Sequence, residues 1–304
     1  MGNMKNFSVL GKFPWKTLGT APVKDGYGEC LWYAVSGNFK KIPVTDVLNW
    51  DSQGQIDVID KNGNMLANNL AALLVAPRFI LPNQNRFLES DVYSNCGGNY
   101  DAKNYLDTYM PTNAVSGQVN YFSSFPNNRV ASNTNNKTFV LASNDFYNDE
   151  FAFVTVDEIF GPLSKRSDFS AQISALLDDE YFQTVAITGM KGTDSVVCSS
   201  LLSTNQTFCD NWKEMLLLTE LPSSPSAIVV DGTSKGPCMR VLIFGGSKAA
   251  GQIRQSVANK SIPANYIEGN NLSEFNTPIA KSNNFVGFST FNSNSPNADI
   301  LRCI

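Results

Sequence analysis

The chain has 304 residues, of which 42% are hydrophobic and 16% charged, and it carries a net charge of −4 with no histidine. This length and apolar content predict one large globular domain or two of ordinary size. Without histidine, the chain cannot form Ser-His-Asp or Cys-His catalytic groups or a His-ligated metal site. The 34 asparagines and few charges are typical of secreted proteins, and the lack of a basic patch argues against nucleic acid as a partner.

Runs of β-branched and aromatic residues bounded by Gly, Asn and Pro predict strands along the chain. They cover residues 30–36, 70–76, 138–142, 151–156, 185–188, 227–230, 240–244 and 285–288. A helix is predicted to begin at Asp157 and Glu158, whose charges suit its N-terminus, and another candidate covers residues 211–219. A further helix, capped by Asp168, places four apolar residues on one stripe: Phe169, Ile173, Leu176 and Leu177. The predicted fold class is α+β, with antiparallel sheets and a few short helices.

Several other motifs favour ordinary structure over a binding site. The Asn- and Ser-rich stretch from about residue 111 to 137 predicts an exposed loop. Residues 144–150 are rich in oxygen ligands but lack the EF-hand glycine, so a hairpin tip is favoured over a calcium site. The sequence Gly-Gly-Ser-Lys at 245–248 lacks the spacing of a phosphate loop, and the longest apolar run, 70–76, is too short to cross a membrane, which takes about 20 residues. We therefore predict no cofactor, no metal and no catalytic residue.

An internal repeat is the most informative feature of the sequence. The strand at 73–76 precedes Gln84-x-Arg86, and the strand at 241–244 precedes Gln252-x-Arg254 with the same spacing. Farther on, Asn-Tyr-Leu-Asp at 104–107 matches Asn-Tyr-Ile-Glu at 265–268, and Phe-Val at 139–140 matches Phe-Val at 285–286. These matches predict two related β-rich modules, residues 1–170 and 171–304, with a junction near residues 170–200.

The repeated arginines predict two buried ion pairs, because a buried guanidinium needs a carboxylate. Each module offers an acid at the matching place, so we predict that Arg86 lies near Asp107 and Arg254 near Glu268. The alternative is that these arginines bind an anion.

The six cysteines, Cys30, Cys96, Cys198, Cys209, Cys238 and Cys303, are even in number and contain no C-x-x-C motif. A zinc ribbon and a thioredoxin-like site are therefore excluded, and 15 pairings remain. Three disulfides in an oxidising compartment fit the surface composition better than six free thiols do.

Two blocks near the start of the chain, FPWKTLG at 13–19 and DGYGECLWYAVSGNF at 25–39, carry a family resemblance. Further similar segments are residues 48–51, 71–86, 148–149, 211–218 and 297–304. Together they resemble the globular region of bacterial prepilin-like proteins, which are large minor pilins or pseudopilins of type IV pili or type II secretion systems. The family's leader and N-terminal apolar helix do not occur in this sequence, and the Met-Gly start looks like a cloning start, so we expect a truncated head region.

The resemblance implies a non-enzymatic structural subunit of an extracellular filament. The bulk of the head favours a tip or assembly-priming position, with adhesion as a further role. The implied partners are other pilin or pseudopilin subunits and a host or surface ligand, and the implied location is the periplasm and cell surface, with the inner membrane reached only through the missing helix. In pilin-like heads a disulfide often holds the C-terminal strand, so the resemblance implies a disulfide between Cys238 and Cys303. A second disulfide, between Cys198 and Cys209, then closes a short loop. The remaining pair is Cys30 and Cys96.

Two other classes of function stay open. A secreted module that binds a glycan or a surface ligand could use the aromatic residues Tyr121, Phe122 and Phe125. A carboxylate-dependent hydrolase could draw on the acids at 178–180 and 149–150.

Overall fold

The computed structural model describes residues 8–40, 47–82, 84–87, 96, 98, 102–107, 137–143, 147–186, 190–191, 196–222, 226–277 and 284–304. The chain forms two compact units: Met1–Asp46 with Gln53–Ile159, and Val47–Ser52 with Phe160–Ile304. The division precedes the predicted boundary at residue 170 because Phe160 and Phe169 pack against Trp212 of the second unit, with ring centroids 6.1 and 5.0 Å apart. The assignment of residues 47–52 to the second unit was not predicted.

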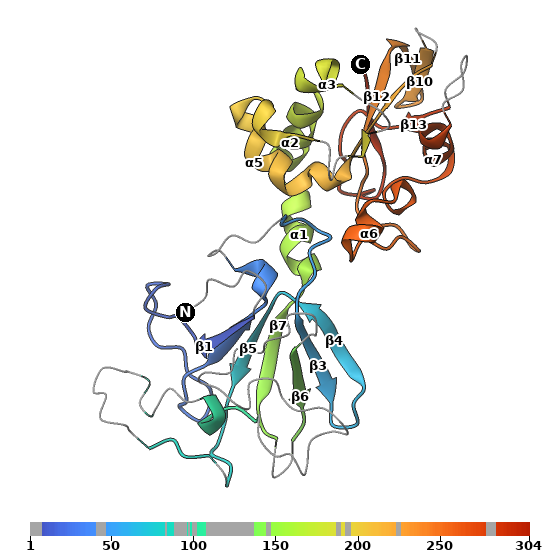
Figure 1. The fold of residues 1–304 in the computed structure, drawn as a ribbon. Coiled ribbons are helices and arrows are strands. Elements are labelled where there is room, and N and C mark those ends of the chain that lie inside the picture. The colour runs from blue at the N-terminus through green and yellow to red at the C-terminus, as the bar shows by residue number, and fades with distance from the viewer. Residues whose placement is uncertain are drawn as a thin grey trace. The chain divides into compact units, whose positions relative to one another are not determined.

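The first unit contains two sheets (Figure 1). One has the order β1-β2-β5-β7 and is antiparallel, with β1 (Val9–Lys12), β2 (Trp32–Val35), β5 (Ala72–Ala76) and β7 (Glu150–Val154). The other has the order β4-β3-β6, with β4 (Met65–Leu70), β3 (Ile56–Asp60) and β6 (Lys137–Leu141). Alternate residues of β2 and β5 are buried in the core with residues of β3 and β6: Trp32, Ala34, Leu73, Val75, Ile56, Val58 and Phe139. The short helices η1 (Gly37–Phe39) and η2 (Ala102–Asn104) complete the described part of this unit.

The second unit also contains two sheets. The first has the order β14-β12-β9-β8, with β14 (Ile300–Cys303), β12 (Arg240–Phe244), β9 (Leu216–Glu220) and β8 (Met190–Lys191). The second has the order β11-β10-β13, with β11 (Thr233–Cys238), β10 (Ser226–Val230) and β13 (Val286–Gly287). Its helices are α2 (Ser167–Leu177), α3 (Tyr181–Thr184), α5 (Ser203–Trp212), α6 (Val257–Lys260) and α7 (Gly269–Asn276), with the short η3 (Cys198–Ser200), η4 (Lys213–Met215) and η5 (Pro263–Asn265). The division between the units falls within α1 (Val156–Ser164).

The two units share one strand order. The strands β1, β2, β5 and β7 correspond to β8, β9, β12 and β14, and β3, β4 and β6 correspond to β10, β11 and β13. In both small sheets the last strand pairs parallel to the first, β6 with β3 and β13 with β10. The α+β fold class is confirmed, with these parallel pairs as an addition to the antiparallel sheets that were predicted.

Most predicted elements are present, and two differ. The stripe of α2 is confirmed, since its buried residues are Phe169, Ile173, Leu176 and Leu177. The helix predicted at 211–219 is wrong: α5 ends at Trp212, and β9 begins at Leu216. Leu216–Thr219 are all buried, and such a continuous apolar run is typical of a strand covered on both faces. The strand predicted at 185–188 is also wrong where it is described, because Val185 is the C-cap of α3 and neither Val185 nor Ala186 lies in a strand.

All six cysteines form disulfides, and the pairing is the one that the resemblance implied. Cys30 binds Cys96, Cys198 binds Cys209, and Cys238 on β11 binds Cys303 on β14. Three disulfides indicate an oxidising, extracellular or periplasmic environment. In the described part of the chain, no helix has the length and apolar character needed to cross a membrane.

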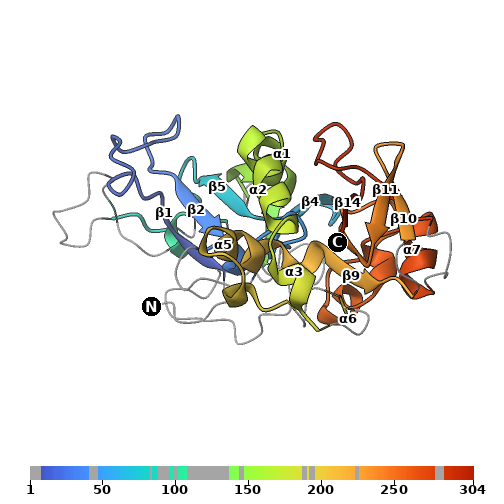
Figure 2. The same ribbon diagram turned by 90° about the horizontal axis from the view of Figure 1, so that it is seen from above.

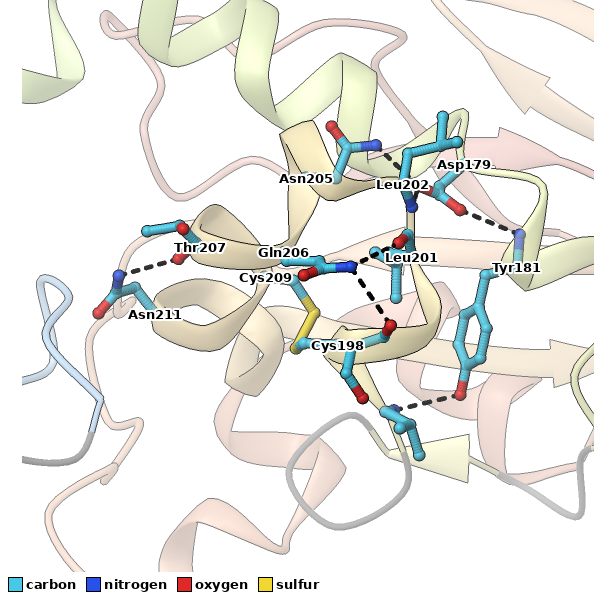
Figure 3. The surroundings of a disulfide bond; sticks show 12 residues. Asp179, Tyr181, Cys198, Leu201, Leu202, Asn205, Gln206, Thr207, Cys209 and Asn211 are labelled. Carbon is cyan, nitrogen blue, oxygen red and sulfur yellow. Dashed lines mark hydrogen bonds between the residues drawn. A yellow bond between two sulfur atoms is a disulfide. The ribbon is translucent and has the colours of Figure 1, made fainter.

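The short disulfide loop is held by a buried acid beside it (Figure 3). Asp179 Oδ2 accepts the N–H of Leu202 at 3.0 Å and Asn205 Nδ2 at 2.8 Å, while Oδ1 accepts the N–H of Tyr181 at 3.1 Å. Asp179 therefore joins the end of α2 to the start of α5. Cys209 lies on α5 itself, so the disulfide ties that helix to η3.

Replacing both Cys198 and Cys209 with alanine is expected to lower the free energy of unfolding by about 3 kcal/mol, because the bond closes a short loop in the unfolded chain. Urea unfolding of the oxidised variant and the oxidised wild type measures this. Equal midpoints and slopes in the two titrations would show that the bond contributes nothing to stability.

Candidate functional site

Two arginine-centred cores, one in each unit, occupy the residues of the internal repeat. In the first unit the guanidinium carbon of Arg86 lies 5.0 Å from the ring centroid of Tyr105. Arg86 Nη2 donates to Gln84 Oε1 at 2.7 Å, and Nε donates to the carbonyl of Asn104 at 2.9 Å. Gln84 Oε1 also accepts the N–H of Leu81 at 3.1 Å. These bonds join the loop after β5 to the segment that contains η2.

The second unit builds the same core from the matching residues. The guanidinium carbon of Arg254 lies 4.3 Å from the ring centroid of Tyr266. Arg254 Nη2 donates to Gln252 Oε1 at 2.8 Å, and Nε donates to the carbonyl of Asn265. Gln252 Oε1 also accepts the N–H of Ala249 at 2.9 Å. The repeated sequence motif therefore corresponds to a repeated set of hydrogen bonds.

The carboxylates that pair directly with the arginines come from outside the repeat. Arg86 Nη1 lies 3.2 Å from Glu29 Oε1. Arg254 Nη1 lies 3.1 Å from Asp51 Oδ2, and both side chains are almost fully buried. Burial raises the pKa of Asp51, and the charge of Arg254 opposes this shift.

The predicted acids, Asp107 and Glu268, have other hydrogen-bond partners and act on the arginines less directly. Glu268 Oε2 accepts Gln252 Nε2 at 3.0 Å, so one amide separates it from Arg254. Asp107 Oδ2 accepts main-chain N–H groups before β7, although the charge of Arg86 still lowers its pKa in part. The sequence argument looked for the acid at the same place in both repeats and therefore missed Glu29 and Asp51, which pair directly with the arginines.

Main-chain carbonyls complete the binding of both guanidiniums. Arg86 Nη1 donates to the carbonyl of Arg78 at 2.7 Å, and Arg254 Nη1 donates to that of Gly246 at 2.9 Å. A Cβ on Gly246 would lie 2.4 Å from the carbonyl oxygen of Pro296, so this glycine allows two chain segments to touch. Every nitrogen of each guanidinium donates within its own unit, which favours an architectural role over anion binding.

Two buried carboxylates of the first unit bind each other's main chain. Asp149 Oδ2 accepts the N–H of Asp107 at 2.8 Å, and Asp107 Oδ2 accepts the N–H of Asp149 at 2.5 Å. Burial raises the pKa of Asp107 to about 6. Burial and the charge of Asp107 raise the pKa of Asp149 well above its ordinary value. Protonation at mildly acidic pH relieves the repulsion within this pair.

Asp299 is the matching acid of the second unit, since Asp149 and Asp299 each precede the last strand of their unit. Its Oδ2 accepts Asn271 Nδ2 at 2.7 Å, and its Oδ1 is buried without a hydrogen-bond partner. Burial raises the pKa of Asp299 to about 7, which the hydrogen bond from Asn271 opposes. In each unit, therefore, burial raises the pKa of the carboxyl group that lies directly before the last strand.

Two of the remaining candidate acids, Asp178 and Asp179, make structural contacts. Asp179 binds the main chain around α5 as described above, and the neighbouring Asp178 forms an ion pair with Arg302, with Oδ1 and Nε 2.6 Å apart. Over the residues described, no group of three or more Cys, Asp or Glu side chains could hold a metal ion. The aromatic residues Tyr121, Phe122 and Phe125 and the oxygen-rich positions 144–146 lie outside the described residues.

Sequence reasoning missed Glu29, Asp51 and Asp299 as members of these cores. All three lie in segments that carry the family resemblance, but only Asp299 had an internal signal. Asn148-Asp149 and Ala298-Asp299 each lie directly before the last strand of their unit, and this match could have extended the repeat.

Comparisons with known proteins identify no relative: no family model, no curated protein and no solved structure matches the chain.

Proposed function

We propose that the chain is the head of a filament subunit of the prepilin-like class, placed at the tip or in the priming complex of the filament. The observation that carries this proposal is the pair of disulfide-stapled units with one strand order. A duplicated head is bulky, and close helical packing along a filament shaft favours small heads. The three disulfides suit a protein that works outside the cytoplasm.

The chemistry of the cores supports a structural role rather than a catalytic one. The side chains of the repeated arginines and glutamines form hydrogen bonds with residues of their own units. The segments that carry the family resemblance supply core residues, among them Trp32 of β2 and Leu217 and Leu218 of β9. The segments that carry the resemblance therefore belong to the core of the head. The role in a filament is our proposal from that resemblance.

Immunogold electron microscopy of filaments sheared from cells that naturally make the protein tests this proposal. We expect gold at filament ends in the wild type and no gold in a strain without the gene. Gold spread evenly along the shaft contradicts the tip position, and filaments without gold contradict the filament role.

A second candidate function, recognition of a glycan or another surface ligand, is favoured by an exposed aromatic loop in the first unit. Phe79 and Ile80 follow β5 and are 47% and 55% exposed, whereas the matching residues after β12 are Ser247 and Lys248. The Tyr27 ring packs edge-on against Phe79, with centroids 5.7 Å apart. Exposed aromatic faces on a rigid support are suited to stacking on sugars.

Binding to an array of immobilised glycans tests this second candidate. The double substitution Tyr27→Ala and Phe79→Ser should abolish any signal that the wild type gives. Leu202→Ser, at an exposed apolar residue of the second unit, is the matched control and should leave the signal intact. Equal signals from the double variant and the wild type would exclude this loop as the ligand site.

A further inference from the structure

An ion pair lies beside the exposed aromatic residues Tyr27 and Phe79 of the first unit. Arg78 Nη1 lies 2.9 Å from Glu150 Oε1, and the Glu150 side chain is 64% exposed. Arg78 also contacts Tyr27: its guanidinium carbon lies 5.4 Å from the centroid of the ring, and Nη2 donates to the hydroxyl at 3.3 Å. The Tyr27 ring in turn contacts that of Phe79. We call these four residues the aromatic patch.

The strand registers bring the residues of the aromatic patch to one end of the first sheet. In Figure 2 the strands β1, β2 and β5 lie side by side, and Trp32 pairs with both Lys12 and Val75. Val75 pairs in turn with Phe151 of β7. The loop between β1 and β2, the loop after β5 and the start of β7 therefore meet at the same end of the sheet.

The aromatic patch has a rigid support. Asp25 joins its two loops, because Oδ1 accepts the N–H of Tyr27 at 2.9 Å and Oδ2 accepts that of Arg78 at 2.7 Å. Asn148 Nδ2 donates to the carbonyl of Phe79 at 2.7 Å and holds the loop after β5 at a second point. A site whose main chain is fixed in this way loses little conformational freedom when a ligand binds, which favours affinity.

Arg78 has a main-chain conformation that favours glycine. Its φ angle is +50°, in the left-handed region that costs free energy for a residue with a side chain. The second unit has Gly246 at the matching position, since Arg86 donates to the carbonyl of Arg78 as Arg254 donates to that of Gly246. Unfavourable main-chain conformations are concentrated at functional sites, so the arginine at this position indicates a use for its side chain.

The paired charges determine which sugars suit the aromatic patch. Arg78 offers N–H donors beside the acceptors of Glu150, and this arrangement suits neighbouring hydroxyl groups, because each hydroxyl both donates and accepts. Exposed ion pairs contribute little stability, so a sugar can replace part of their mutual contact. A sugar with a carboxylate would meet the negative charges of Glu150 and Asp25, which both act on Arg78, and such repulsion creates specificity. The aromatic patch therefore favours a neutral sugar.

We propose that the aromatic patch binds neutral hexose units of a glycan. The rings of Tyr27 and Phe79 contact the apolar face of the sugar. Arg78 and Glu150 bind its neighbouring hydroxyl groups. The proposal rests on the second candidate function, which it narrows to one class of sugar, and it is independent of the filament role.

Binding of the full chain to paired sugar hexamers tests the class of sugar. Hexamers of glucose, mannose and galactose are each compared with the hexamer of the corresponding uronic acid in the same linkage, so that the two probes differ only in the carboxylate at C6. We expect calorimetry to show binding of at least one neutral hexamer, with its uronic acid counterpart bound at least about tenfold more weakly. A smaller difference, or a preference for the uronic acid, would overturn the neutral class and leave glycan recognition standing. No binding of any probe would remove both.

Substitutions at the ion pair test whether the aromatic patch is the binding site. Arg78→Gly introduces the residue found at the matching position of the second unit and suits the left-handed φ, so the chain should stay folded while its affinity for the neutral hexamer decreases about tenfold or more. Glu150→Ala, at the exposed start of β7, should cause a decrease of similar size. Arg166→Gln, which breaks an exposed ion pair in the second unit, is the control and should leave the affinity unchanged. Thermal unfolding verifies that each variant is folded, and wild-type affinity in either Arg78→Gly or Glu150→Ala would overturn the proposal.

Discussion

Replacing Arg254 with methionine is expected to lower the free energy of unfolding by about 3–5 kcal/mol, because the change leaves a buried carboxylate without its partner. Asp51 is 6% exposed and sits 3.1 Å from the arginine. The substitution also removes donors from Gln252 Oε1 and the carbonyl of Gly246. Urea unfolding, followed by tryptophan fluorescence, measures the loss, since Trp50 and Trp212 both belong to this unit.

Two further variants separate the buried charge from general damage. Adding Asp51→Asn to Arg254→Met should restore part of the stability, because the uncompensated carboxylate is then gone. Arg166→Gln breaks an exposed ion pair with Asp168 and should leave the unfolding midpoint unchanged. A double variant less stable than Arg254→Met alone would refute the assigned role of Asp51.

The second large effect concerns pH and Asp299. Burial raises the pKa of Asp299 to about 7 in the folded protein, whereas the ordinary pKa of an aspartate, which applies to the unfolded chain, is 3.8. The folded state therefore binds a proton that the unfolded state has lost, and this group's contribution to stability is complete below pH 3.8. It decreases as the pH rises toward 7 and is lost above that, a change of about 4 kcal/mol. We expect Asp299→Asn, which stays neutral, to be more stable than the wild type above pH 7 and to have a flatter pH profile between 4 and 7.

Unfolding free energies measured at intervals from pH 4 to pH 8 test this expectation. The variant keeps some pH dependence, because Asp107 and Asp149 of the first unit also have raised pKa values. Asp210→Asn, at an exposed position on α5, is the matched control and should follow the wild-type profile. A profile for Asp299→Asn that coincides with the wild type would show that this carboxyl is not protonated in the folded protein.

The repeat was predictable because its signals are local. Gln84 with Arg86 and Gln252 with Arg254 have fixed spacings after a strand, and the stripe of α2 has helical periodicity. The ion-pair partners were not predictable in this way, because Asp51 lies about 200 residues before Arg254 and no repeat position links them. The misassigned residues 216–219 form a strand buried on both faces, and a short apolar run of this kind has no period that separates helix from strand.

The assignment of residues 47–52 to the second unit has a consequence for any attempt to divide the protein. The chain passes from one unit to the other three times, so no single cut yields two complete pieces. A fragment that begins at residue 160 lacks Asp51, the partner of Arg254, and Trp50, whose ring lies 4.6 Å from that of Trp212. During synthesis, residues 47–52 are made more than a hundred residues before the rest of the second unit. The core of that unit can therefore form only after the later residues have been made. Deletion studies should therefore keep 47–52 with the second half, supplied as a fused or added peptide.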